Sequence, residues 1–168
     1  TDGGLSWAMT TSPNQLHNVT CVSQDTRIGH EDTWYFGSGE LTGSSASGGE
    51  AYYGGNGIYK SVDGGLSWDS LAVTATNTNG FDSNFDFIWN VKTDPSNDSL
   101  DVVYAAVYSA IYRSENGGNS WRKIDNIPGA PNQSYVNNVY LSRHDVNVIY
   151  VAFNHHKYGD FKPYIFKS

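Results

Sequence analysis

Carboxylates and aromatic side chains occur together in two polar stretches of this 168-residue sequence. Two carboxylates can act on a glycosidic bond as general acid and as nucleophile or base. Aromatic rings add flat apolar faces with a preferred contact geometry. The stretch 37–56 contains Glu40, and the stretch 77–90 contains Asp82 and Asp86, which makes these three acids the candidate catalytic residues. The candidate ligand-binding side chains are Tyr52, Tyr53, Phe81, Trp89 and His155.

The same stretches also have a structural interpretation. Residues 37–56 are rich in Gly and Ser, and such segments commonly form solvated linkers. Aspartates such as Asp82 and Asp86 are typical of turns, and Trp89 lies in an apolar pattern typical of a buried strand. The residue types favour these structural roles over catalysis.

A metal centre is not expected. The adjacent residues His155 and His156 would point to opposite faces of an extended strand, so they do not readily share one ion. Asp160 lies nearby, but no third ligand stands at a suitable spacing. The one cysteine, Cys21, has no indicated histidine partner and is expected to be a buried apolar side chain. We expect no cofactor.

Composition narrows the function classes. The net charge is -7, and the few arginines are scattered, whereas a nucleic-acid-binding surface needs clustered Lys and Arg. No apolar run is long enough to form a transmembrane segment. Charged residues make up 16% of the chain, against roughly 25% in ordinary domains, and aromatic residues make up 14%. This bias, with 18 glycines, predicts an all-β fold.

An internal repeat must position the candidate residues. Residues 1–7 (TDGGLSW) recur as 62–68 (VDGGLSW) and, more loosely, as 115–121 (ENGGNSW). The pentapeptides 57–61 (GIYKS), 110–114 (AIYRS) and 164–168 (YIFKS) also match. The interval of about 50 to 60 residues predicts blade repeats over 1–61, 62–114 and 115–168. The first repeat begins inside the motif and the third stops just before it. We therefore expect one larger propeller domain, with further blades of the same chain as partners.

Each repeat is predicted to contain four short strands. Two follow the motif, at 68–73 and 87–92 in the second repeat, and two more precede the next motif. The later pair lies at 102–108 and 110–114, and the third repeat has matching segments at 121–124, 136–141 and 148–153. Four strands per repeat predict three four-stranded antiparallel blades of a β-propeller. A parallel β-helix would have shorter repeats, and a helical solenoid would show a 3.6-residue period.

The repeated motif is interpreted as a structural hairpin. Its glycines accept positive φ, its acid accepts hydrogen bonds inside the turn, and its Trp supplies apolar area between neighbouring sheets. Asn116 replaces the acid in the third copy and keeps an acceptor without the charge. The structural residues of the motif are Asp2, Gly4, Trp7, Asp63, Gly65, Trp68, Asn116, Gly118 and Trp121.

Residues 61–68 (SVDGGLSW) resemble the Asp-box, or BNR repeat. This motif occurs in sialidases, sortilin-type Vps10 propellers, xyloglucanase-type glycosidases and many secreted bacterial propellers. Residues 34–40 (WYFGSGE) with 54–61, and residues 159–168, resemble secreted bacterial proteins of the sortilin-like BNR class. The resemblance implies a β-propeller in which the Asp-box hairpins lie on the face opposite the active site. It also implies an extracellular or cell-surface protein, including substrates of bacterial secretion systems.

Loop lengths indicate where function lies. Each repeat has a strand tyrosine, and the number of residues from it to the Ser before the next box differs between repeats. This segment is longest from Tyr35 to Ser61 and shortest from Tyr104 to Ser114. The box hairpins themselves do not vary. If the box joins the third and fourth strands, the variable loops emerge at the other end of the antiparallel sheet. We expect function at that end.

Several functions remain open. The sequence favours a non-catalytic scaffold that binds protein or glycan. The alternative is a two-carboxylate glycoside hydrolase of the xyloglucanase type, and the resemblance also allows sortilin-like peptide binding in the propeller tunnel. A sialidase is disfavoured, because it needs an arginine cluster and only Arg27 and Arg143 stand away from the boxes. Self-association into a closed ring is favoured less than completion by further blades.

Overall fold

The computed structural model describes residues 2–12, 18–43, 51–78, 80–125, 127, 134–142, 145, 147–157 and 160–168. The side chains of 41–43, 51–52, 134–137, 153–157 and 160–164 lie outside the described residues. The described elements are β-strands and one short 3-10 helix, which confirms the predicted all-β class. Within this part of the chain, no helix is long and apolar enough to cross a membrane.

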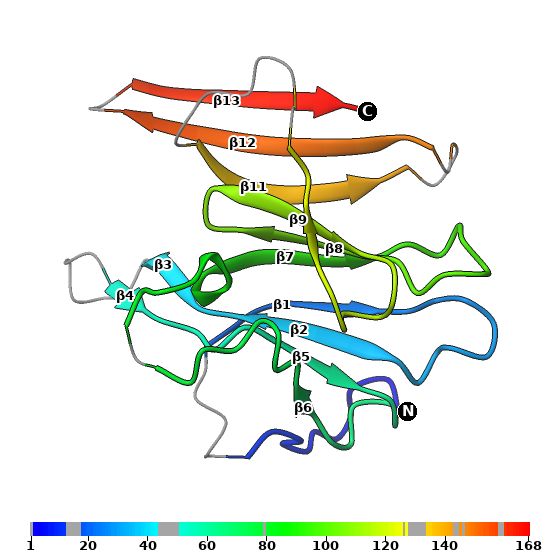
Figure 1. Ribbon diagram of the computed structural model, residues 1–168. Helices are drawn as coiled ribbons and strands as arrows, with labels where there is room; N and C mark the ends of the chain where they lie inside the picture. The colour runs from blue at the N-terminus through cyan, green and yellow to red at the C-terminus, as the bar shows by residue number, and fades with distance from the viewer. Residues whose placement is uncertain are drawn as a thin grey trace.

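Three antiparallel sheets follow one another along the chain and lie in the same order in space (Figure 1). The first has the order β1-β2-β5-β6, and its strands are Val19–Gln24, Trp34–Ser38, Ile58–Ser61 and Asp69–Ser70. The second has the order β10-β9-β8-β7, with β7 to β10 at Ile88–Thr93, Val103–Val107, Ala110–Ser114 and Arg122–Lys123. The third consists of β11 (Ser134–Leu141), β12 (Ile149–Lys157) and β13 (Asp160–Lys167).

Two smaller elements lie at one end of the stack. Strands β3 (Glu40–Gly43) and β4 (Ala51–Tyr53) form a hairpin between β2 and β5. The 3-10 helix η1 (Asn84–Asp86) precedes β7 and is capped by Ser83. Both elements lie in the stretches that carry the candidate site residues.

The strands on either side of each box pair with one another. Tyr59 of β5 pairs with Ser70 of β6, and Arg113 of β9 pairs with Arg122 of β10. A box hairpin therefore lies within one sheet. The sheets group residues 19–70, 88–123 and 134–167, whereas the sequence repeats divide the chain inside the box hairpins.

The middle sheet has a buried core on each face. Along β8, Val103, Ala105 and Val107 pack toward the first sheet. The alternate residues around them, Tyr104 and Ala106, pack toward the third sheet. This alternation follows from the two-residue period of a strand, and each fully buried Val stabilises the fold by about 1.5–3 kcal/mol. The two cores fix the three sheets relative to one another.

Candidate functional site

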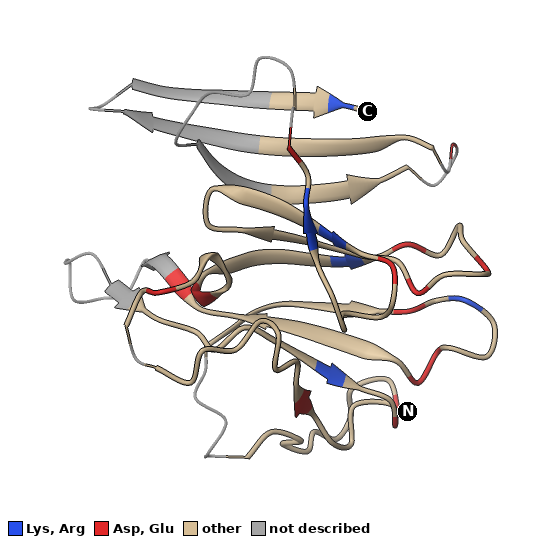
Figure 2. Cartoon of the chain, viewed as in Figure 1, with Lys and Arg blue, Asp and Glu red and all other residues tan. Residues whose placement is uncertain are grey.

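The loops divide between two ends of the sheets. The box hairpins 62–68 and 115–121 lie at the same end as the turns from β1 to β2 and from β7 to β8 (Figure 1). Acidic residues are concentrated in those two turns (Figure 2). The loops 39–57 and 71–87 emerge at the other end, because neighbouring strands run in opposite directions. This confirms the predicted separation of the variable loops from the boxes.

The box hairpins are closed by their own side chains. Asp63 accepts hydrogen bonds from the Ser67 amide at 2.9 Å and the Ser67 hydroxyl at 2.6 Å. The Ser61 hydroxyl donates to Asp63 at 2.7 Å and accepts from the Gly65 amide at 2.9 Å. Gly64 and Gly65 have φ values of 74° and 86°, where glycine avoids the strain of a side chain. Asn116 in the next box likewise accepts from the Ser114 hydroxyl and the Ser120 amide, but its Nδ2 donates to the Ser120 hydroxyl, the reverse of the Asp63 bond.

The three box tryptophans have different surroundings. Trp121 packs beside Phe85 between the first two sheets, with ring centroids 5.7 Å apart. Trp68 contacts Phe36 edge-on at 4.8 Å, on the face of the first sheet that points away from the second. Trp7 is 90% exposed. Only Trp121 lies between two described sheets.

An aromatic cluster lies at the end opposite the boxes. Phe81 contacts Tyr108 at 4.7 Å and Phe87 at 5.3 Å. The Tyr108 amide donates to the Asn84 and Phe87 carbonyls, so the β8–β9 turn is tied to the η1 segment. Phe87 is fully buried, whereas Phe81 is 46% exposed. The cluster therefore presents the partly exposed Phe81 ring to solvent, packed against the buried Phe87 and the half-buried Tyr108.

The two candidate aspartates beside this cluster differ in environment. Asp82 is exposed and accepts a 2.6 Å hydrogen bond from the Thr78 hydroxyl. That hydrogen bond is the largest cause that holds the pKa of Asp82 below its ordinary value. Asp86 is completely buried, and its Oδ2 atom accepts from the Asp82 and Ser83 amides at 2.8 and 2.7 Å. Its Oδ1 atom has no hydrogen-bond partner among the described residues.

Asp86 also joins the two loops at this end. Its carbonyl accepts from the Gly55 amide at 2.8 Å. At Gly39, with φ +91°, an added Cβ would lie 1.8 Å from the same carbonyl, so only glycine allows this approach. Glu40 directly follows Gly39 and is half-buried. The structure thus places the backbone of Gly39, the neighbour of Glu40, in close contact with the Asp86 carbonyl.

The other candidates are less well defined. Tyr53 is exposed and pairs through its backbone with Glu40 in the β3–β4 hairpin. Trp89 is half-buried on β7. The side chains of Tyr52 and His155 lie outside the described residues, as do those of His156 and Asp160. Cys21 packs against the first core, where burial raises the pKa of its thiol.

A polar cluster that the sequence did not single out lies at the box end. Arg27 donates to both carboxylate oxygens of Asp25 and to Asp101, the latter at 2.6 Å. Its remaining Nη1 donates to the Asn97 and Leu100 carbonyls. Asp25 and Asp101 raise the pKa of Arg27, so the guanidinium stays charged. The Asp25-x-Arg27 spacing in the sequence could have indicated the pair between these two side chains. No sequence pattern indicates that Asp101, 74 positions from Arg27, also binds it.

Three members of this cluster have the residue types of a metal site. Ligand atoms of Asp25, His30 and Asp101 lie within 4.8 Å of one another. The Arg27 Nη2 atom is within 2.6 Å of both carboxylates and 3.5 Å from His30 Nδ1. A guanidinium already balances the two carboxylates there. The arrangement is that of a structural clamp between the first two sheets.

No family model and no curated protein sequence matches the chain. The crystal structure of the GH74 xyloglucanase from Xanthomonas campestris is similar in fold, with a TM-score of 0.50 and 13% sequence identity. The similarity covers 91% of this chain and 29% of that one, so the chain spans less than a third of the length of the enzyme. At this identity the comparison shows the fold alone: the three antiparallel sheets are β-propeller blades.

Proposed function

We propose that this chain is a glycan-binding part of an extracellular or cell-surface β-propeller, and that its ligand binds at the end opposite the boxes. The single observation that carries this proposal is the partly exposed Phe81 ring beside the ionised Asp82 carboxylate. An aromatic face packs against the C–H groups of a sugar ring, while a carboxylate accepts charge-assisted hydrogen bonds from its hydroxyls.

The surroundings of Phe81 support a preformed surface. The rings of Tyr108 and Phe87 pack against the Phe81 ring, with centroids 4.7 and 5.3 Å away. Asp82 is fixed by Thr78, and its own amide is bound by Asp86. Fewer side chains must therefore be ordered when a ligand binds, which favours affinity. The partly exposed Tyr53 at the same end offers a second aromatic contact.

The alternative is a glycoside hydrolase, the class of enzyme to which the GH74 xyloglucanase of similar fold belongs. Hydrolysis needs two accessible carboxyl groups about 5–10 Å apart, one of them protonated at working pH. Asp82 has a lowered pKa and makes a poor proton donor, while Asp86 is fully buried beneath it. Glu40 remains as the half-buried third candidate. These environments favour binding over catalysis.

A sialidase receives less support. Arg27, which the sequence was expected to place away from the boxes, lies instead at the box end, where two carboxylates and two carbonyls of the clamp bind it. It cannot also hold a substrate carboxylate without breaking those bonds. Arg143 lies outside the described residues.

Titration calorimetry with soluble xyloglucan, and with a charged polysaccharide for comparison, tests the proposal. Phe81→Ala should weaken binding by about tenfold, because a stacked aromatic contributes on the order of 1–1.5 kcal/mol. Ile28→Ala is the matched control, since Ile28 is an exposed apolar residue at the box end. Equal affinity of all three proteins, or no binding to any polysaccharide, would contradict a glycan surface at Phe81. Release of reducing ends in the same mixtures would favour the hydrolase.

A further inference from the structure

The buried carboxylate of Asp86 has one oxygen atom whose binding capacity is not used. Asp86 is completely buried, and its Oδ2 atom accepts from the Asp82 and Ser83 amides. Its Oδ1 atom has no hydrogen-bond partner within the described part of the chain. Burial of a polar atom without a partner is costly, so a group that satisfies Oδ1 stabilises this end of the protein.

The surrounding loops supply no basic side chain for that purpose. The loops 39–57 and 71–87 and the turn 108–109 join strands at this end of the first two sheets, and their sequences contain neither lysine nor arginine. Figure 2 accordingly shows no basic residue in the described part of these loops. Because buried charges are normally paired or coordinate a metal ion, this arrangement favours an external cation.

A second carboxylate lies beside Asp86. The Asp82 amide donates to Asp86 Oδ2 at 2.8 Å. The Thr78 hydroxyl is the largest cause of the lowered pKa of Asp82, and the Asp86 carboxyl is a smaller one, so the two carboxyl groups lie close together. Neighbouring carboxylates repel each other unless a positive charge lies between them. Asp82 is exposed, so the pair is accessible to an ion from solvent.

Neutral oxygen atoms lie next to this pair. Thr78 Oγ1 is 2.6 Å from Asp82 Oδ2, and Thr76 Oγ1 is 3.3 Å from Thr78 Oγ1. A hydroxyl that donates to a carboxylate keeps lone pairs for a metal ion. The segment 76–86 contains no histidine and no cysteine, which are the ligands typical of Zn²⁺. Its carboxylate and hydroxyl oxygens are the type of ligand that Ca²⁺ takes.

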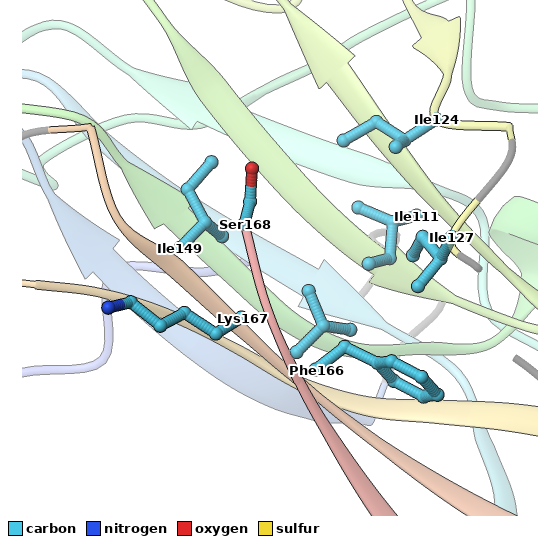
Figure 3. A pocket seen from close by; sticks show the side chains of 8 residues that line it. Ile111, Ile124, Ile127, Ile149, Phe166, Lys167 and Ser168 are labelled. Carbon is cyan, nitrogen blue, oxygen red and sulfur yellow. The ribbon is translucent and has the colours of Figure 1, made fainter. Parts of the chain in front are cut away.

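Two other places in the described part of the chain do not offer this chemistry. A pocket of about 210 Å³ between the second and third sheets is lined mainly by apolar side chains, such as Ile111 and Phe166 (Figure 3). The clamp at the box end contains Asp25 and Asp101, but Arg27 lies within 2.6 Å of both and already balances their charge.

We propose that the segment 76–86 binds one Ca²⁺ ion at the end opposite the boxes. Asp86 Oδ1 and the Asp82 carboxylate supply the negative charge, and the Thr78 hydroxyl supplies a neutral ligand. Water molecules complete the roughly six to eight oxygen atoms that Ca²⁺ takes. The ion fixes the segment that carries Phe81, which directly precedes Asp82. This site departs from the sequence-based expectation of no cofactor, and it does not depend on the proposed glycan function.

Calorimetric titration of the chelator-treated chain with CaCl₂ tests the site. One Ca²⁺ ion should bind with a dissociation constant of about 10⁻⁴–10⁻³ M, because only two carboxylates contribute. Asp82→Asn should weaken binding by about tenfold, and Thr78→Val should weaken it less. Asp98→Asn is the matched control, because it removes the same charge from an exposed turn at the box end and should leave the affinity unchanged.

Asp86→Asn should abolish binding, but it also alters the cap of η1, which Asp86 forms with the Ser83 amide. Asp82 and Thr78 are exposed, so their variants should fold, and circular dichroism checks this. Thermal melts give a second measurement. A tenfold excess of Ca²⁺ over its dissociation constant should raise the wild-type Tm by about 3–6 °C. Equal MgCl₂ should raise it less, because Mg²⁺ demands a near-ideal octahedral site.

Two results would overturn the proposal. One is the absence of both binding heat and a Tm increase up to about 10 mM CaCl₂, beyond the weakest dissociation constant expected. A water molecule or a proton would then satisfy Asp86 Oδ1. The other is equal Ca²⁺ affinity of Asp82→Asn and Asp98→Asn. Polysaccharide titrations in EDTA separate the two proposals, because glycan binding without Ca²⁺ supports the glycan surface whatever the calcium result.

Discussion

Arg27 Nη2 lies 2.6 Å from Asp101 Oδ1, and this ion pair joins the turn after β1 to the turn after β7. Arg27 also forms a bidentate pair with Asp25, and both of those side chains are only 6% exposed. The first two blades are therefore connected at the box end by a charged group that is almost completely shielded from water.

Replacement of this arginine should weaken the whole stack. Arg27→Met leaves Asp25 buried without its partner, and such a loss costs about 3–5 kcal/mol of unfolding free energy. Arg27→Lys keeps the charge but loses the bidentate geometry, so an intermediate loss is expected. Urea unfolding measures the loss of unfolding free energy in both variants. Arg122→Met on the exposed strand β10 is the control, and a loss no larger than that of the control would contradict the clamp.

The Asp63 box should contribute to acid sensitivity. Hydrogen bonds from the side chain and the backbone of Ser67 lower the pKa of Asp63 to about 2, from 3.8. The folded-state pKa lies below the unfolded one, so the stabilisation is present above about pH 4 and is lost as the pH falls through about 2. Asp63→Asn copies the Asn116 box and should remove this part of the pH dependence. Thermal melts across that range measure it, and identical acid slopes would contradict the assignment.

The close contact of Gly118 with Leu71 gives a prediction about blade packing. Gly118→Ala forces a side chain to φ +93° and places its Cβ 2.5 Å from Leu71 Cδ1, so it should destabilise the fold by more than the conformational cost of about 1–2 kcal/mol. Gly3→Ala, at φ +67° with no atom within 4 Å, should show only the conformational cost. Adding Leu71→Ala to Gly118→Ala should recover part of the loss. Equal losses for the two glycine variants would contradict the contact.

The repeat made the blades predictable from the sequence. The matching pentapeptides at 57–61, 110–114 and 164–168 became β5, β9 and the end of β13, because a short apolar strand before a fixed turn has few alternatives. The box turns followed for the same reason: Gly-Gly accepts positive φ, and an adjacent acid caps the turn. Local chemistry was sufficient for these elements.

The candidate site was harder to predict because it depends on contacts between distant residues. Asp82 and Asp86 are equal candidates in the sequence. In the structure Asp86 lies in η1, accepts a capping hydrogen bond from the Ser83 amide and is buried, whereas Asp82 is exposed. Tyr108 was not singled out, although its ring holds Phe81. The Arg27 clamp was missed because Asp101 lies 74 positions away, and no short-range pattern links the two.

The ionisation of Asp82 gives the last prediction. If the carboxylate accepts hydrogen bonds from sugar hydroxyls, Asp82→Asn should weaken glycan binding, and wild-type affinity should stay constant as the pH falls from 7 to about 5. The Thr78 hydroxyl holds the pKa of Asp82 below its ordinary value of 3.8, so affinity should fall only under more acidic conditions. Thr78→Val removes that hydrogen bond and should move the loss of affinity to a higher pH. Calorimetric titrations at a series of pH values measure the midpoint of this loss. Ser96→Ala, at an exposed turn of the box end, should leave the midpoint unchanged. The same midpoint in wild type and Thr78→Val would show that Asp82 does not contact the glycan.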